Sequence, residues 1–169
     1  ELGHPALGMS KAFLHLEKTE VVQKDGTKSG QKVTREVMIF PRFHQWDCVR
    51  QVVSSAKVKG AGSNYLIQHS AGSGKSNSIA WVAHRLAGLY DAEDKKVYHS
   101  VIVVTDRVVL DQQLQNTIFQ FEHKWGVVER IDKDSAQLAQ ALSAGTPIII
   151  TTLHKFGFLQ DKIAGLPDR

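Results

Sequence analysis

The sequence predicts an α/β fold in which a parallel sheet is flanked by helices on both faces. Strand-like apolar runs alternate with helical patterns, and two of these runs are apolar throughout, as strands buried on both faces require. A loop of small residues separates another strand-like run from the helix that follows it. With 169 residues, of which 42% are hydrophobic, the chain has enough apolar surface for one compact core.

Composition narrows the class of protein. A net charge of +4 permits a polyanionic partner without requiring one. The single cysteine, Cys48, excludes an internal disulfide and indicates a reducing compartment. No apolar run reaches the roughly 18 residues of a membrane span. The first residues have neither a signal-peptide pattern nor an initiator methionine, so we expect the chain to belong to a longer or processed protein.

The chain changes character near residue 37. Residues 1–36 are weakly patterned, and we interpret them as a linker that precedes a domain at 37–169. Residues 11–22 fit a helix or a strand equally well. Residues 23–32 predict a polar turn, because they contain the hairpin signal Asp25-Gly26.

Two amphipathic helices are expected, one on each side of a short strand at 65–69. The first helix follows Pro41, and its apolar face comprises Trp46, Val49, Val53 and Ala56. The second runs from Ser76 to Tyr90, and its inward positions are Ile79, Val82, Ala83 and Leu86. Trp81 lies off this face, so we expect it at the surface or against another part of a parent protein.

Strands and helices also alternate in the second half of the chain. The expected strands are 100–106, 127–131 and 147–153, and the expected helices are Val109 to Phe121 and 134–142. The apolar positions of the first of these helices fall on one face and are Leu110, Leu114, Ile118 and Phe121. The second begins with a capping residue, either Asp134 or Ser135.

The loop that follows residue 69 has the features of a phosphate-binding loop. Gly72 and Gly74 allow backbone angles and a close approach that a side chain would block. Successive N–H groups can then point into one concavity, and the helix that follows adds partial positive charge. Lys75 is the catalytic candidate because it can reach the β- and γ-phosphates, and Ser76 can offer its hydroxyl to Mg²⁺. The nucleotide-binding candidates of this segment are Ala71, Gly72, Ser73, Gly74, Lys75, Ser76 and Asn77.

Alternatives to this interpretation remain open. The full loop pattern has Gly or Ala five residues before Gly74, where this chain has His69, which either crowds the loop entrance or points away from it. A competing hypothesis takes Asp106, at the end of a strand, as the Mg²⁺ carboxylate of a small kinase-like NTPase. A third hypothesis is a non-catalytic DNA-binding module, whose affinity would depend on salt and not on nucleotide.

Four segments occur together in this chain, and they are FPRFHQWDCVRQV, NYLIQHSAGSGKSNSIAWVAHRL, VIVVTDRVVLDQQLQNTIFQFEH and GTPIIITTLHKF. In sequence, order and spacing they resemble the motor region of the R subunit of type I restriction-modification enzymes, which are superfamily two, DEAD-box-like translocases. The resemblance covers about residues 37–160 and implies the first RecA-like lobe of a P-loop NTPase. It further implies ATP and Mg²⁺ as cofactors and double-stranded DNA as the partner, with residues 1–36 as the end of a linker from a nuclease domain.

The same resemblance implies roles for residues outside the loop. Gln45 would hydrogen-bond the adenine edge, and Phe43 or Arg42 would stack on the base. Two motifs would contact DNA phosphates without reading sequence. Their residues are Thr105, Arg107 and Gln113 in the first motif, and Thr152, His154 and Lys155 in the second.

Part of the machinery for hydrolysis is missing from this sequence. No DEAD- or DEAH-type segment follows Leu153, and the chain contains neither a second lobe with arginine fingers nor a nuclease constellation. We therefore expect a lobe truncated before that motif, which binds nucleotide, barely hydrolyses it and does not cleave DNA alone. The further partners implied by the resemblance are methyltransferase and specificity subunits, in the cytoplasm of a bacterium or archaeon.

Overall fold

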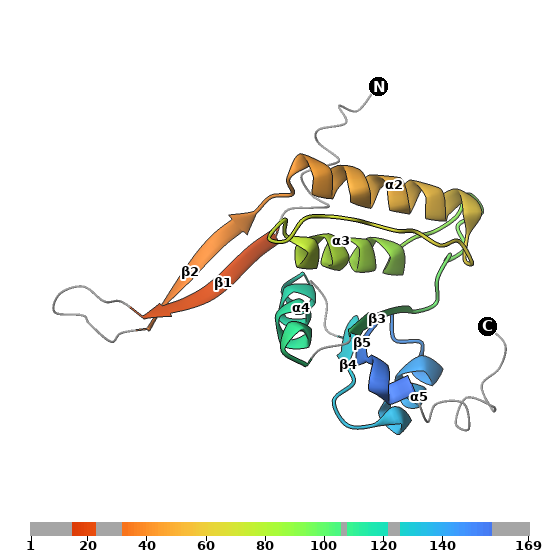
Figure 1. The fold of residues 1–169 in the computed structure, drawn as a ribbon. Coiled ribbons are helices and arrows are strands. Elements are labelled where there is room, and N and C mark those ends of the chain that lie inside the picture. Colours follow the sequence, from red (N-terminus) through yellow and green to blue (C-terminus); the bar gives the residue numbers. More distant parts are fainter. Residues whose placement is uncertain (1–14, 23–31, 106–107, 122–125, 157–169) are drawn as a thin grey trace. The chain divides into compact units, whose positions relative to one another are not determined.

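A computed structural model describes residues 15–22, 32–105, 108–121 and 126–156 (Figure 1). The chain divides into two compact units, residues 1–42 and residues 43–169, and each is described by itself. No helix in the described part of the chain is long and apolar enough to cross a bilayer.

The first unit contains a β-hairpin. β1 (His15–Val22) pairs antiparallel with β2 (Lys32–Ile39), in a register that runs from His15 opposite Ile39 to Val22 opposite Lys32. The ambiguous stretch at 11–22 is therefore a strand where it is described. The sequence does not predict β2, and the turn predicted at Asp25-Gly26 lies outside the described residues.

The second unit contains a parallel sheet of three strands. They are β3 (Val101–Thr105), β4 (Val128–Arg130) and β5 (Ile148–Thr152), in the order β3-β5-β4. The helices of this unit are α2 (Phe43–Lys59), α3 (Lys75–Ala87), α4 (Val108–Gln120) and α5 (Ser135–Ala144). β5 is central, since Ile148 pairs with Val101 on one side and Val128 on the other. Residues 148–151 are buried, which confirms the buried strand predicted there.

Helices cover both faces of this sheet. α5 packs Leu138 and Ala141 against Ile149 of β5. Ile148 and Ile150 point to the opposite face, because side chains alternate along a strand, and both are fully buried. α3 and α4 also contact β5. The predicted α/β architecture, an incomplete RecA-like lobe with a flanked parallel sheet, is thus confirmed (Figure 1).

The start of α5 agrees with its predicted cap. Oδ1 of Asp134 accepts hydrogen bonds from the N–H groups of Ala136, at 2.9 Å, and Gln137, at 3.0 Å. These bonds satisfy two of the donors that a helix leaves without partners at its N-terminus. Asp134, and not Ser135, is therefore the capping residue.

The buried face of α2 is rotated from the predicted one. Its buried residues are Gln45, Val49, Val52 and Ala56. Trp46 and Val53, which were expected to face the core, are only half-buried. The apolar pattern misses this rotation because α2 packs on a polar loop as well as on α3, and the polar residue Gln45 faces that loop.

Trp81 lies in the core, so the expectation that it lies at the surface or against another part of a parent protein was wrong. Its side chain is 1% exposed, and its ring meets that of Phe121 edge to face with centroids 5.5 Å apart. α4 packs against this side of α3, and the indole fills the space between the two helices. Ile79, which was expected to face inward, is 40% exposed instead.

The strand predicted at residues 65–69 does not form in the structure. These residues have no regular secondary structure, and Leu66 is 94% exposed. β3 is likewise not buried on both faces as predicted, because Ile102 and Val104 are partly exposed. A strand requires a hydrogen-bonded neighbour, and no strand of the described part pairs with residues 65–69 or with the outer edge of β3.

Candidate nucleotide-binding site

The predicted phosphate-binding segment is a curled loop in front of α3. The N–H of Ser73 donates to the carbonyl of Ser70 at 3.4 Å, which closes a turn. Gly72 and Gly74 have φ angles of 71° and 80°, in the left-handed region that favours glycine. The loop leads directly into α3, whose first N–H groups have no partner inside the helix. Backbone donors and the positive end of the helix dipole therefore meet at this loop.

Gln45 fastens this loop to α2. Its side chain is buried, and Nε2 donates to the carbonyl of Ser73 at 3.3 Å and to that of Gly74 at 2.9 Å. A Cβ atom at Gly74 would lie 2.5 Å from the same nitrogen. Glycine is thus required at position 74 by its positive φ and also by the closeness of Gln45. The sequence predicts only an adenine contact for Gln45 and misses its contact with the loop.

Lys75 folds back over the loop that precedes it. Its Nζ donates to the carbonyls of His69, at 3.2 Å, and Ser70, at 2.8 Å, and its side chain is exposed. The ammonium group therefore lies beside the loop, where a polyphosphate would require a cation. Of the other candidates here, Ala71 is exposed at the tip of the loop, and the N–H of Asn77 donates to the carbonyl of Gly74 at 3.1 Å.

The residues present fit a magnesium nucleotide. Ser76 is half-buried in the first turn of α3. No group of three or more His, Cys, Asp or Glu side chains in the described residues could hold a metal ion, and among the candidates described at the loop Ser76 would offer an oxygen to Mg²⁺. The hydroxyl oxygens of Ser73 and Ser78 are buried without a hydrogen-bond partner. Buried polar atoms normally have partners, and phosphate oxygens or their water would supply them.

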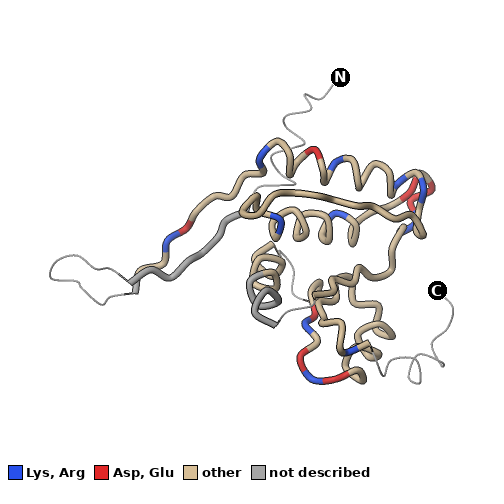
Figure 2. The backbone as a smooth tube through the Cα atoms, viewed as in Figure 1, with Lys and Arg blue, Asp and Glu red and all other residues tan. Residues whose placement is uncertain are grey.

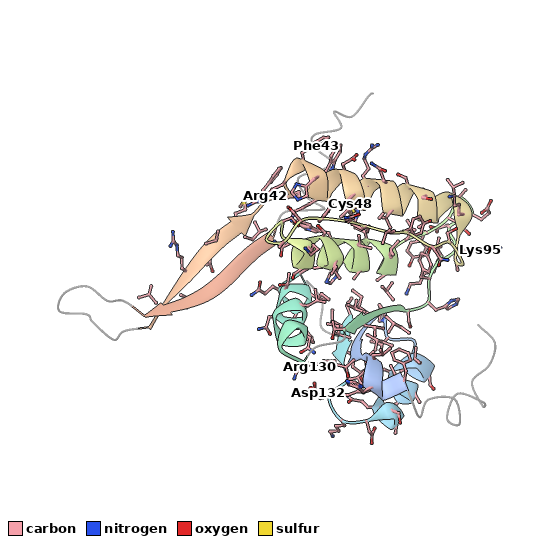
Figure 3. All side chains as sticks on the ribbon, in the orientation of Figure 1. Arg42, Phe43, Cys48, Lys95, Arg130 and Asp132 are labelled. Atoms are coloured by element: carbon pink, nitrogen blue, oxygen red, sulfur yellow. The ribbon has the colours of Figure 1, made fainter. Side chains whose placement is uncertain are left out.

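The two candidates for stacking on the base differ in how far the structure describes them. Phe43, labelled in Figure 3, begins α2 and is 76% exposed, and the centroid of its ring lies 6.0 Å from that of Trp46. Arg42 is exposed but belongs to the first compact unit, so its position relative to the loop is not determined. Both roles stay predictions.

The structure places three of the predicted DNA-contact residues at the carboxyl edge of the sheet. Thr105 ends β3 and Thr152 ends β5, and the two are paired in register. His154 follows in a short 3-10 helix, η2 (Leu153–Phe156), and is exposed. Lys155 instead donates to the carbonyl of Ile131, so its ammonium is turned to the main chain.

The other residues of these hypotheses cannot be placed. Arg107 and Asp106 lie outside the described residues, and so does the side chain of Gln113 in α4. The DNA contact of Arg107 and the kinase-like role of Asp106 therefore stay predictions.

A groove of about 730 Å³ connects the loop with the edge of the sheet. Lys75 and Ser76 line one end of it, and the outer edge of β3 lines the other side. Its remaining walls include Ile79, Val82, Ala83 and Leu86, the four residues predicted to face the core from α3. The helical periodicity identifies the apolar side of α3 here, although that side faces a groove.

A parallel sheet flanked by helices, with a lysine-bearing glycine loop at the start of a helix, defines a P-loop ATPase lobe. Residues 44–168 match the SWI2/SNF2 ATPase family, and the chain belongs to that family, which places it among the superfamily two helicase-like ATPases. No curated protein and no solved structure matches the chain significantly.

Proposed function

We propose that this chain is the ATP-binding lobe of a double-stranded DNA translocase, and that it belongs to the R subunit of a type I restriction enzyme. Membership of the SWI2/SNF2 ATPase family supports the motor lobe. The four quoted segments, from residue 40 to residue 156, support the restriction subunit. The observation that carries the nucleotide role is the curled loop at 70–74, held by Gln45 and followed directly by Lys75 and α3.

Binding of MgATP tests the nucleotide role directly. We expect calorimetric titration to detect MgATP binding by the chain, and Lys75→Ala to weaken it about tenfold or more, because a charge-assisted contact with the phosphates is lost. The control is Lys95→Ala, which removes an exposed lysine in the turn before β3 (Figure 3). Absence of MgATP binding by the unaltered chain, or equal affinity in the Lys75 variant, would contradict the role.

Hydrolysis and DNA binding test the motor role. The sequence lacks a DEAD- or DEAH-type carboxylate after Leu153, so ATP turnover by this chain alone should stay near background even with DNA present. In the second unit, Lys and Arg are spread over several elements of the described part (Figure 2). We therefore expect DNA affinity to be weak, independent of sequence and lowered by salt, and Thr152→Ala to reduce it for all sequences alike.

The restriction role requires partner subunits. We expect the full-length protein that carries this lobe to assemble with methyltransferase and specificity subunits, and the assembly to move along double-stranded DNA when ATP is supplied. Failure to assemble with them would remove the restriction assignment and leave the ATPase class intact.

A further inference from the structure

His44 makes a third hydrogen bond from α2 to the phosphate loop, beside the two of Gln45. Its Nε2 lies 3.2 Å from the carbonyl oxygen of Ser73, the oxygen that Gln45 also contacts. A carbonyl oxygen can only accept, so Nε2 of His44 must carry the hydrogen. The residue is half-buried in the first turn of α2, and no motif of the sequence gives it a role.

Because the peptide bond is planar, this contact also fixes the direction of a backbone N–H that would bind phosphate. In a trans peptide, the C=O of one residue and the N–H of the next point in opposite directions. Two donors on α2 hold the carbonyl of Ser73 toward that helix, so the N–H of Gly74 is held away from it. The carbonyl of Gly74 accepts from Gln45 and from the N–H groups of Asn77 and Ser78, and these bonds together fix the N–H of Lys75 in the same way. The N–H groups of Gly74 and Lys75 belong to the series that would bind phosphate oxygens.

His69 supports His44 from the other end of the loop. The two imidazole rings pack edge to face, with centroids 5.0 Å apart and planes at 90°. Nδ1 of His69 is buried and has no hydrogen-bond partner. The interaction that the structure shows for this ring is therefore its packing on His44. The carbonyl of His69 also accepts from Lys75. His69 is bulkier than the Gly or Ala usual at this position, and it packs against His44 of α2.

We propose that His44 and His69 are positioning residues of the nucleotide site, which orient the loop by a hydrogen bond to Ser73 and by ring packing. This inference rests on the proposed ATP binding. Neither residue contacts the nucleotide in the proposal, and both act through the backbone of the loop. Their effect is therefore on the phosphates and is the same for any base.

The test separates the hydrogen bond from the ring. His44→Phe keeps an aromatic ring against His69 but removes the donor, and we expect it to weaken MgATP binding about fivefold to tenfold. His44→Gln places an amide N–H near the position of Nε2, and it should restore affinity to within about threefold of the unaltered chain. Should the phenylalanine variant not fold, His44→Met, with a chain of similar length and no donor, gives the same comparison with His44→Gln.

Inorganic tripolyphosphate distinguishes positioning of the loop from a contact with the base. We expect His44→Phe to weaken the binding of ATP, GTP and tripolyphosphate by the same factor. His69→Gly should weaken binding of MgATP as well, and its effect should be smaller when His44 is already Met, because that variant has lost both the ring that packs on His69 and the donor. Three results would overturn the inference. They are a loss of affinity confined to ATP, a failure of His44→Gln to restore affinity, and additive effects of the changes at His44 and His69.

The outcomes also separate this inference from the proposed function. If the unaltered chain does not bind MgATP, the proposed function fails. If it binds and Lys75→Ala weakens binding as expected, while His44→Phe and His69→Gly bind as tightly as the unaltered chain, only the positioning role fails.

Discussion

Gly74 illustrates at the scale of one residue how the backbone of the loop and its neighbours constrain each other. Its φ angle of 80° disfavours any side chain, and a Cβ would also meet the amide nitrogen of Gln45 at 2.5 Å. Gly72 has a similar φ angle, 71°, but a Cβ there would have nothing within 4 Å. A side chain at either position would therefore be strained by the positive φ angle, and only at position 74 would it also clash with a neighbour.

We predict that Gly74→Ala destabilises the chain more than Gly72→Ala. The left-handed backbone costs both alanines about 1–2 kcal/mol. Displacing buried Gln45 should cost Gly74→Ala about 1 kcal/mol or more in addition. Urea denaturation of the two variants measures the difference in the free energy of unfolding. Equal losses would show that the contact with Gln45 does not constrain the loop.

A second prediction at this scale concerns Cys48, which is half-buried on α2. Burial raises the pKa of its thiol above the ordinary value of 9.0, and the negative charge of Asp47 raises it further. The folded state therefore holds the thiol proton more tightly than the unfolded state, so its contribution to stability is lost as the pH rises through the raised pKa. The rate of alkylation by iodoacetamide should accordingly reach half its maximum above pH 9.0.

The single cysteine makes this measurement unambiguous, because mass spectrometry then reports one site. In Asp47→Asn the midpoint should move to lower pH but stay above the ordinary value, since burial is the larger cause. A midpoint that is unchanged in Asp47→Asn would refute the charge contribution.

At the scale of secondary-structure elements, those with a local signal are predictable from sequence. α5 has a capping aspartate and an αL glycine at its end, and β5 is an uninterrupted apolar run. Residues 65–69 show where such signals fail, because an apolar run becomes a strand only beside a hydrogen-bonded neighbour. β2 shows the converse, since pairing with β1 forms a strand from a weak pattern.

The packing interface between α3 and α4 allows a prediction with a matched control on α3. Trp81→Ala removes a ring that is almost fully buried against Phe121, and it should lower the free energy of unfolding by about 3–5 kcal/mol. Ile79→Ala, on the groove side of α3, should cost about 1 kcal/mol or less, because that side chain is already partly exposed. Similar losses for the two variants in urea would mean that Trp81 does not anchor α4.

At the scale of the whole molecule, the sequence predicts which residues form the loop but not which residues of α2 hold the loop in place. The glycines, Lys75 and Ser76 are identifiable because their chemistry depends on spacing along the chain. The bonds from His44 and Gln45 to residues 73 and 74 join positions 28 and 29 apart, so they exist only once α2 has packed. Burial of Trp81 has the same origin, in the docking of a later helix.

The two compact units allow a prediction about where nucleotide acts. All the described contacts of the loop lie within residues 43–169. We expect saturating MgATP to slow amide hydrogen exchange at residues 69–78 and in the first turn of α2, because a ligand that binds only the folded state stabilises what it contacts. The amides of β1 and β2 should exchange at the same rate with and without nucleotide. Lys75→Ala serves as the control, since at the same concentration of MgATP its weaker binding should give less protection at these amides. Protection of β1 and β2 equal to that of the loop would instead bring the first unit, with Arg42, into the nucleotide site.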